Sequence, residues 1–115
     1  MDFLSSQTAQ NLARSVAGES QARSRYTVYA GQARKEKQEF IARIFEQTAD
    51  NEKVHAQEFL EMLVKLAGGP VHNIDLTAGY PYALGSTADN LQFATEGEGQ
   101  EHDTIYPEFA RIARE

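Results

Sequence analysis

The chain of 115 residues contains no cysteine. This absence excludes disulfides, thiolate metal ligands and a cysteine nucleophile, so oxygen and imidazole groups would have to hold any metal ion. The chain also lacks an apolar run near the roughly 20 residues of a membrane helix, and its N-terminus lacks the basic and then apolar pattern of a signal peptide. We therefore expect a cytoplasmic protein with no membrane partner.

Positive charge is scarce, because 11 lysine and arginine residues stand against 17 aspartate and glutamate residues, for a net charge of −6. Such an acidic chain argues against nucleic acid as a partner, since binding to phosphates requires a basic surface. A hydrophobic content of 41% with 24% charged residues is ordinary for a globular protein. The length predicts a single domain over residues 1–115.

Three segments show apolar residues at every third or fourth position, which is typical of amphipathic helices. The first runs from about Ser6 to Lys35, and the second runs from about Lys37 to Leu66, where a Gly-Gly-Pro sequence stops it. The third begins near Ser86 or Thr87 and contains Pro107, which should bend it. No strand pattern competes, so the sequence predicts an all-α fold with three long helices.

The connections between these segments differ greatly in length. The first two helices are joined so closely that they should form an antiparallel hairpin, whereas residues 67–86 form a long crossover between helices 2 and 3. One long crossover is a feature of ferritin-like helical bundles. The third helix then lacks an antiparallel neighbour. We expect another subunit to complete the bundle, or a fourth helix missing from a chain truncated at its C-terminus.

Acidic residues lie in the middle of each apolar stripe. Glu52 and His55 lie one turn apart on one side of the second helix, Glu98 and Glu101 repeat this spacing in the third, and Glu19 lies within the first. Burying isolated carboxylates costs several kcal/mol each, so a compensating positive charge is needed. Two divalent cations fit the number of acids, and oxygen with imidazole ligands suits iron or manganese.

Each of these motifs alone has a simpler explanation as a solvated or edge position of a helix. Arg23 could neutralise Glu19 without a metal ion, and we expect His102, beside Glu101, to lie at the surface. Only the coincidence of acids at the middle of three helices favours a metal site. Tyr26 and Tyr106 are interpreted as core residues whose hydroxyls can also donate to metal-bound carboxylates.

Four stretches resemble the ferritin-like diiron domain of the rubrerythrin family. They are AGESQARSRY at residues 17–26, TADNEKVHA at residues 48–56, NLQFATEGEGQE at residues 90–101 and YPEFA at residues 106–110. The resemblance implies two non-haem iron ions, for which manganese or zinc could substitute. It implies five metal ligands, namely Glu19, Glu52, His55, Glu98 and Glu101, with Tyr26 and Tyr106 as hydrogen-bonding neighbours of the ligands. In that family one iron moves between the groups matched here by Glu101 and His55 as the redox state changes.

The resemblance also implies an activity, the reduction of hydrogen peroxide to water in defence against oxidative stress. Two family features are absent from this sequence, the Glu-x-x-His of a fourth helix and the cysteine-ligated rubredoxin domain. An external electron donor such as rubredoxin is therefore expected, together with a homodimer in which helices can be exchanged. Two alternatives remain open: a ferritin-like protein that oxidises and binds iron, and a truncated helical oligomer with a partial or empty metal site.

Overall fold

The computed structural model describes residues 2–100 and 105–114, without the side chains of residues 100 and 113. Within this part of the chain every regular element is helical, which confirms the predicted all-α fold. The elements in order are the 3₁₀ turn η1 (Phe3–Ser5), α1 (Gln7–Lys35), α2 (Glu39–Ala67), α3 (Thr87–Gln100) and α4 (Tyr106–Arg114). Across the described residues, no helix is both long enough and apolar enough to span a membrane.

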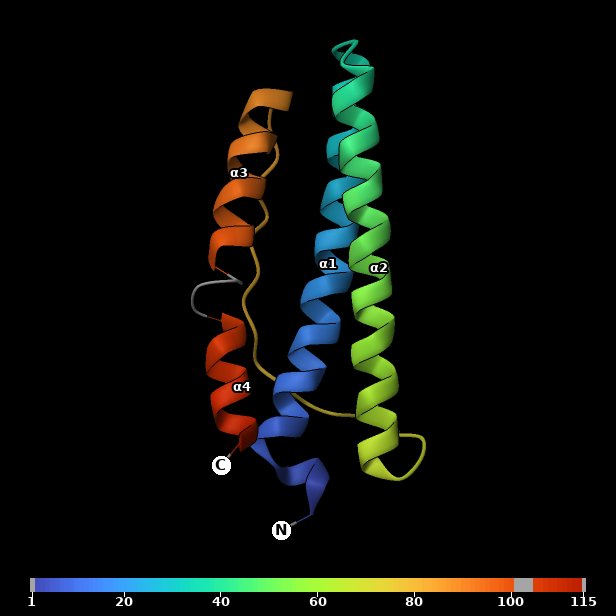
Figure 1. Ribbon diagram of the computed structural model, residues 1–115, viewed down its shortest axis with the longest axis vertical. Coiled ribbons are helices and arrows are strands. Elements are labelled where there is room, and N and C mark those ends of the chain that lie inside the picture. Colours follow the sequence, from blue (N-terminus) through green and yellow to red (C-terminus); the bar gives the residue numbers. More distant parts are fainter. Residues whose placement is uncertain (1, 101–104, 115) are drawn as a thin grey trace.

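The helices α1 and α2 form an antiparallel hairpin that occupies one side of the molecule in Figure 1. The helices α3 and α4 follow one another along the other side, and both contact α1. The crossover leaves the end of α2, passes between α1 and the pair α3 and α4, and reaches the far end of the bundle before α3 begins. This long crossover agrees with the connection expected of a ferritin-like bundle.

Local sequence signals set the ends of the hairpin helices. The side chain of Ser6 accepts a hydrogen bond of 3.1 Å from the backbone N–H of Ala9 and so caps the start of α1. At the end of α2, Gly68 has a φ of 83°, a left-handed conformation that favours glycine. The N–H of Gly69 then reaches back 3.1 Å to the carbonyl of Val64, as in a Schellman motif.

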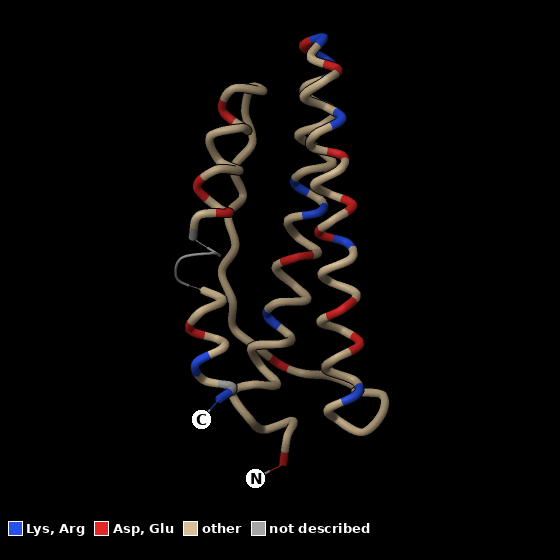
Figure 2. The backbone as a smooth tube through the Cα atoms, in the orientation of Figure 1, with Lys and Arg blue, Asp and Glu red and all other residues tan. Residues whose placement is uncertain are grey.

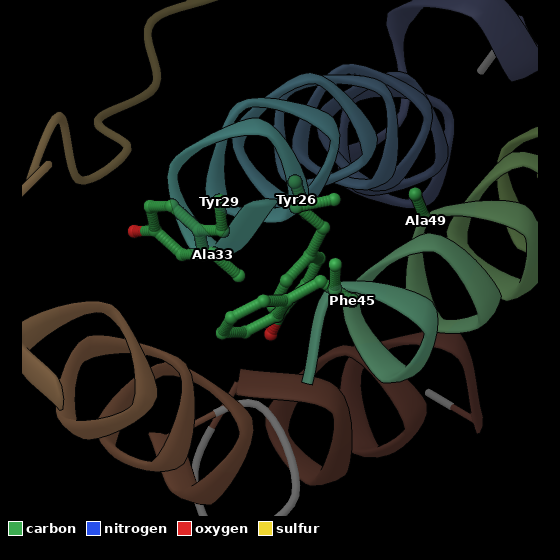
Figure 3. Packing of buried hydrophobic residues seen from close by; sticks show 8 residues of the cluster. Tyr26, Tyr29, Ala33, Phe45 and Ala49 are labelled. Carbon is green, nitrogen blue, oxygen red and sulfur yellow. The ribbon is translucent and has the colours of Figure 1, made fainter. Parts of the chain in front are cut away.

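Small residues and aromatic rings together form the core between α1 and α2. Alanines at the contact allow the two helices to approach closely, and they are Ala22, Ala30, Ala33, Ala42 and Ala49. Three rings, those of Tyr26, Tyr29 and Phe45, fill the space beside them (Figure 3). The rings of Tyr29 and Phe45 meet edge to face with centroids 5.4 Å apart, a favoured aromatic geometry.

The crossover has no regular structure, and α1 side chains satisfy several of its carbonyl groups. Arg14 donates to the carbonyl of Thr77 at 3.0 Å, and Tyr29 donates to that of Ala83 at 2.7 Å. In return, the hydroxyl of Tyr80 donates to the carbonyl of Arg14 at 2.7 Å. The Tyr80 ring lies so close to Gly18 that a Cβ there would be 3.1 Å from it. Helix α1 therefore has two packing partners: it packs against α2, and it also holds the crossover in place.

Of the third segment, the structure describes α3 and α4, and residues 101–104 between them lie outside the described residues. The bend expected at Pro107, the second residue of α4, therefore stays a prediction. One expectation from the sequence differs from the structure. The uncovered apolar surface lies mainly on α2 and not on the third segment, since Phe40, Ile44 and Leu66 of α2 are all exposed. The reason is that α3 and α4 pack against α1, whereas the described residues place no helix over this side of α2.

One carboxylate connects the end of α1 to the start of α3. Glu36 Oε2 accepts hydrogen bonds of 2.8 Å from both the backbone N–H and the hydroxyl of Thr87, which is buried. Hydrogen bonds from the Gln32 side chain and from Thr87 hold the pKa of Glu36 below its ordinary value of 4.5. The charged form of Glu36 is therefore the form that stabilises the fold.

We predict that Glu36→Ala lowers the melting temperature near neutral pH, because buried groups of Thr87 lose their acceptor. Since the folded pKa of Glu36 is lowered, its contribution is complete above about pH 4.5 and is lost as the pH falls through the folded value. The difference in melting temperature between wild type and variant should therefore narrow in acid. The control is Glu96→Ala, because Glu96 accepts only a local hydrogen bond from Gln92. Equal melting temperatures of the two variants at neutral pH would contradict this prediction.

Candidate metal centre

Three side chains from the middle of α1 and α2 converge on one point of the hairpin. Glu19 comes from α1, and Glu52 and His55 lie one turn apart on α2. One ligand atom from each residue lies within 4.8 Å of the others, a spacing that allows all three to bind the same metal ion. Two carboxylates and an imidazole are a ligand set suited to divalent transition metals such as iron and manganese.

The burial of these carboxylates provides a test of whether a cation fits between them. Glu19 is 2% exposed and Glu52 is 4% exposed. Each has one oxygen, Oε2, with no hydrogen-bond partner among the described residues. Such unpaired buried oxygens are costly, and two of them carrying like charges are more so. A bound cation would compensate both, so the residues present fit a metal ion.

The position of Glu19 and Glu52 along the hairpin explains why their carboxylates are shielded from solvent. On one side lies the aromatic and alanine core that contains Tyr26 and Phe45. On the other side lies a second apolar cluster built on Leu12 and Leu63. The acidic residues therefore form a polar layer between two apolar clusters. Water is excluded from this layer along the hairpin axis, which strengthens every electrostatic interaction within it.

His55 departs from the expectation that it would be buried. Its side chain is 51% exposed, although its Nδ1 lies 3.5 Å from Glu19 Oε2 and 3.7 Å from Glu52 Oε2. The same unpaired oxygens therefore face the imidazole nitrogen. The ring lies at the edge of the hairpin contact because its other side belongs to the open face of α2. Helical periodicity placed His55 on the correct side of α2 but could not show that this side is uncovered.

Two tyrosines connect carboxylates on different helices. The hydroxyl of Tyr106 on α4 donates a hydrogen bond to Glu19 Oε1, the oxygen that does not face His55. The Tyr106 ring also packs against Phe59 of α2 with centroids 6.0 Å apart. The hydroxyl of Tyr26 on α1 donates to Glu98 Oε1 on α3 at 3.0 Å. Both tyrosines therefore hold a carboxylate named by the resemblance in one orientation.

The remaining residues singled out in the sequence do not join the three converging groups. Glu98 is exposed and not buried as its mid-stripe position suggested, although its Oε1 accepts a hydrogen bond from Tyr26 of α1. Glu101 and His102 lie outside the described residues. Arg23 is exposed on α1, so it is not the buried partner of Glu19 that its spacing allowed. The structure therefore brings together three of the five ligands expected from the resemblance.

A cavity of about 430 Å³ lies beside the three converging groups, between α1, the crossover and α4. Tyr80 and Tyr106 are part of its lining, together with Gly18, Arg14 and Arg25, whereas Glu19, Glu52 and His55 are not. Burial raises the pKa of the Tyr80 phenol, which keeps its hydroxyl protonated. The cavity was not expected from the sequence, in which its one signal is Tyr80 of the crossover between Gly79 and Pro81.

We predict that Glu52→Gln raises the melting temperature of the metal-free protein, because it removes one of two like charges from the polar layer. The unpaired carboxylate oxygen costs about 1–3 kcal/mol. The same variant should lose most of the stabilisation that Mn²⁺ gives to the wild type. Thermal unfolding with and without Mn²⁺ measures both effects, with the exposed Asp50→Asn as control. A Glu52→Gln variant that Mn²⁺ stabilises as much as wild type would contradict the assignment of Glu52 as a ligand.

We predict that Tyr106→Phe destabilises the fold by about 1–3 kcal/mol, because a hydrogen bond to a buried carboxylate is lost. The matched control is Tyr80→Phe, since the Tyr80 hydroxyl donates to a neutral carbonyl, that of Arg14. Its loss should cost about 1 kcal/mol or less. Urea unfolding of the three proteins measures the difference, and a larger cost for Tyr80→Phe would show that the bond to Glu19 is unimportant for stability.

Comparison with known proteins agrees with this geometry. A sequence model of the rubrerythrin family matches residues 10–115. The rubrerythrin of Clostridium perfringens is 46% identical over 109 residues, which cover 94% of this chain and 55% of that protein. The rubrerythrin of Porphyromonas gingivalis is 46% identical over 111 residues, covering 96% of this chain and 52% of that protein. The rubrerythrin of Nitratidesulfovibrio vulgaris is 40% identical, with 96% and 55% covered.

The chain thus spans about half the length of these relatives. The match extends over almost all of the described helices and includes the residues of the polar layer. On this similarity, the chain belongs to the rubrerythrin family.

Proposed function

We propose that this chain reduces hydrogen peroxide to water at a non-haem centre of two iron ions, as part of the defence against oxidative stress. One observation carries the proposal: the convergence of Glu19, Glu52 and His55 with two buried carboxylate oxygens that have no partner among the described residues. Membership of the rubrerythrin family supports it. The domain proposed to do this is the whole of residues 1–115, and we propose a cytoplasmic location.

Each residue has a proposed part in holding this centre. Glu19, Glu52 and His55 would bind the metal directly, because their ligand atoms are already close together. Glu98 and Glu101 are proposed as further ligands on the resemblance to the family, with Glu101 and His55 as the two ends of a redox-linked switch. Iron bound here would supply the electrons that split the O–O bond, one from each ferrous ion.

Tyr106 and Tyr26 fix the orientation of carboxylates at the proposed site. Because Tyr106 donates to Glu19 Oε1, the other oxygen of Glu19 stays turned toward Glu52 and His55. Tyr26 restrains Glu98 in the same way from α1. Each hydroxyl also keeps a proton beside a carboxylate that would bind metal. The overall reaction consumes two electrons and two protons per peroxide, and we propose that the electrons come from an external donor such as rubredoxin.

The test is peroxide consumption by the purified chain after anaerobic loading with ferrous iron, with reduced rubredoxin as the electron donor. We expect steady turnover and at least about one iron ion per chain by elemental analysis. Glu52→Ala should lose both iron and turnover, because it removes a buried ligand. The exposed Glu96→Ala should keep both.

Two results would contradict the proposal. Iron content well below one ion per chain in the wild type would exclude a native diiron centre. Iron oxidation by oxygen without peroxide turnover would identify an iron-binding protein of the ferritin type instead.

A further inference from the structure

One face of α1 forms the floor of the cavity between α1, the crossover and α4. Arg14, Gly18, Gln21 and Arg25 line it, and they recur every three or four residues along the helix. The volume of about 430 Å³ falls within the roughly 300–1,000 Å³ that is usual for small-molecule sites. None of the three converging groups of the candidate metal centre lines this cavity, so it is a separate site.

Aromatic rings and glycines form much of the remaining lining. Tyr80 comes from the crossover, and Tyr106 and Phe109 come from α4, where their rings meet edge to face with centroids 6.2 Å apart. Gly97 of α3 leaves open space, because a Cβ there would meet no atom within 4 Å. Aromatic side chains favour an aromatic ligand, which can pack against them in stacked or edge-to-face geometry.

Helix α1 brings positive charge to this cavity. It contains five basic residues and a single acidic one, Glu19, although the whole chain has a net charge of −6. Figure 2 shows basic residues on α1 on either side of this acidic position. Arg14 and Arg25 are the two basic residues of α1 that line the cavity, and both are partly buried. An anion that enters the cavity therefore meets positive charge.

Arg25 has no carboxylate partner among the described residues. Its Nε donates to the side chain of Gln21 at 2.8 Å, and its Nη1 lies 3.5 Å from the Tyr29 hydroxyl. Its Nη2 donates to no described residue. The guanidinium also lies 5.8 Å from the centroid of the Tyr26 ring, a cation–π contact that helps to hold it in place. Because arginine stays charged and its N–H groups form a planar fork, Arg25 is suited to bind a carboxylate.

The other charged groups of the described lining are already engaged. Arg14 donates three hydrogen bonds to neutral acceptors, among them the carbonyl of Thr77, and so helps to hold the crossover. Glu108 is the one acidic residue of this lining, and it pairs with Arg111 at 2.5 Å. Arg25 is therefore the group of the cavity best able to pair with an anion.

We propose that this cavity binds a small aromatic carboxylate, with its ring between Tyr80 and Tyr106 and its carboxylate paired with Arg25. Gly18, where the Tyr80 ring lies, and Arg25 are seven residues apart on α1, about 10 Å, a span that suits an acid with two fused rings. The proposal goes beyond the reduction of peroxide and does not depend on it, because no described residue of the lining is a proposed metal ligand.

The first test is the binding of 2-naphthoate to the metal-free protein, measured by isothermal titration calorimetry. We expect one molecule per chain with a Kd below about 1 mM, which is reasonable for so small a ligand. The neutral 2-naphthamide should bind about tenfold or more weakly, because it cannot accept charge-assisted hydrogen bonds as a carboxylate does. Absence of saturable binding, or equal binding of acid and amide, would overturn the proposal. Decanoate bound as tightly as 2-naphthoate would contradict the preference for an aromatic ligand.

The second test removes the charge of Arg25. Arg25→Gln should bind 2-naphthoate about tenfold or more weakly and should no longer distinguish it from the amide. The matched control is Arg23→Gln, because Arg23 has the same charge on the same helix but is exposed and does not line the cavity. Circular dichroism verifies that both variants remain helical. Equal weakening by the two substitutions would indicate long-range attraction only and would refute a pairing with Arg25.

The third test determines whether the ligand occupies this cavity, by filling it from α3. Gly97→Leu should abolish binding of 2-naphthoate, because its side chain takes up space in the cavity. The matched control is Gly99→Leu: a Cβ at either glycine would meet no atom within 4 Å, but of the two only Gly97 lines the cavity. Unchanged binding by Gly97→Leu would place the ligand elsewhere, such as on the exposed apolar side chains of α2, and would overturn the proposal. Because these measurements use metal-free protein, their failure is distinct from an absence of peroxide turnover.

Discussion

The central constraint on this molecule is the burial of two like-charged carboxylates, Glu19 and Glu52, where α1 meets α2. Alanines at the contact bring the helices close, and this closeness also brings the two acids together. The apolar clusters on either side exclude water from them along the hairpin axis. Hydrophobic packing of the hairpin therefore works against the solvation of its own acids. The conflict is resolved when positive charge lies between them.

The attachment of α3 and α4 also depends on carboxylates, and one of them is Glu19. Tyr106 on α4 binds Glu19, and Tyr26 on α1 binds Glu98 of α3. A third carboxylate, Glu36, binds the first residue of α3. Hydrogen bonds to the carboxylates of Glu19, Glu98 and Glu36 thus connect α3 and α4 to the hairpin at three places along its length. Apolar contact adds to them chiefly through Ala94 on α3 and the ring of Phe59 against Tyr106.

Much of the fold could be predicted from the sequence because its signals are local. Ser6 and Gly68 define helix ends through hydrogen bonds and backbone conformation that depend on few neighbours. The spacing of Glu52 and His55 was also sufficient to place both on one side of α2. The exposure of His55 and of Glu98 could not be predicted, because periodicity gives a direction around a helix and not the element that packs there. The hydrogen bonds from Arg14 and Tyr29 to carbonyl groups of the crossover could not be predicted either, since they join residues that are distant in sequence.

The hairpin that contains the candidate metal centre also has a consequence for the order of folding. Glu19, Glu52 and His55 all belong to α1 and α2, which are joined by only the short segment between Lys35 and Glu39. Contacts within such a hairpin span less sequence than those made by α3 and α4 across the crossover, and closing shorter loops is faster. During synthesis the three groups also leave the ribosome before α3. The half of the molecule that would capture a metal ion is therefore able to form first and to serve as the surface on which the rest of the chain folds.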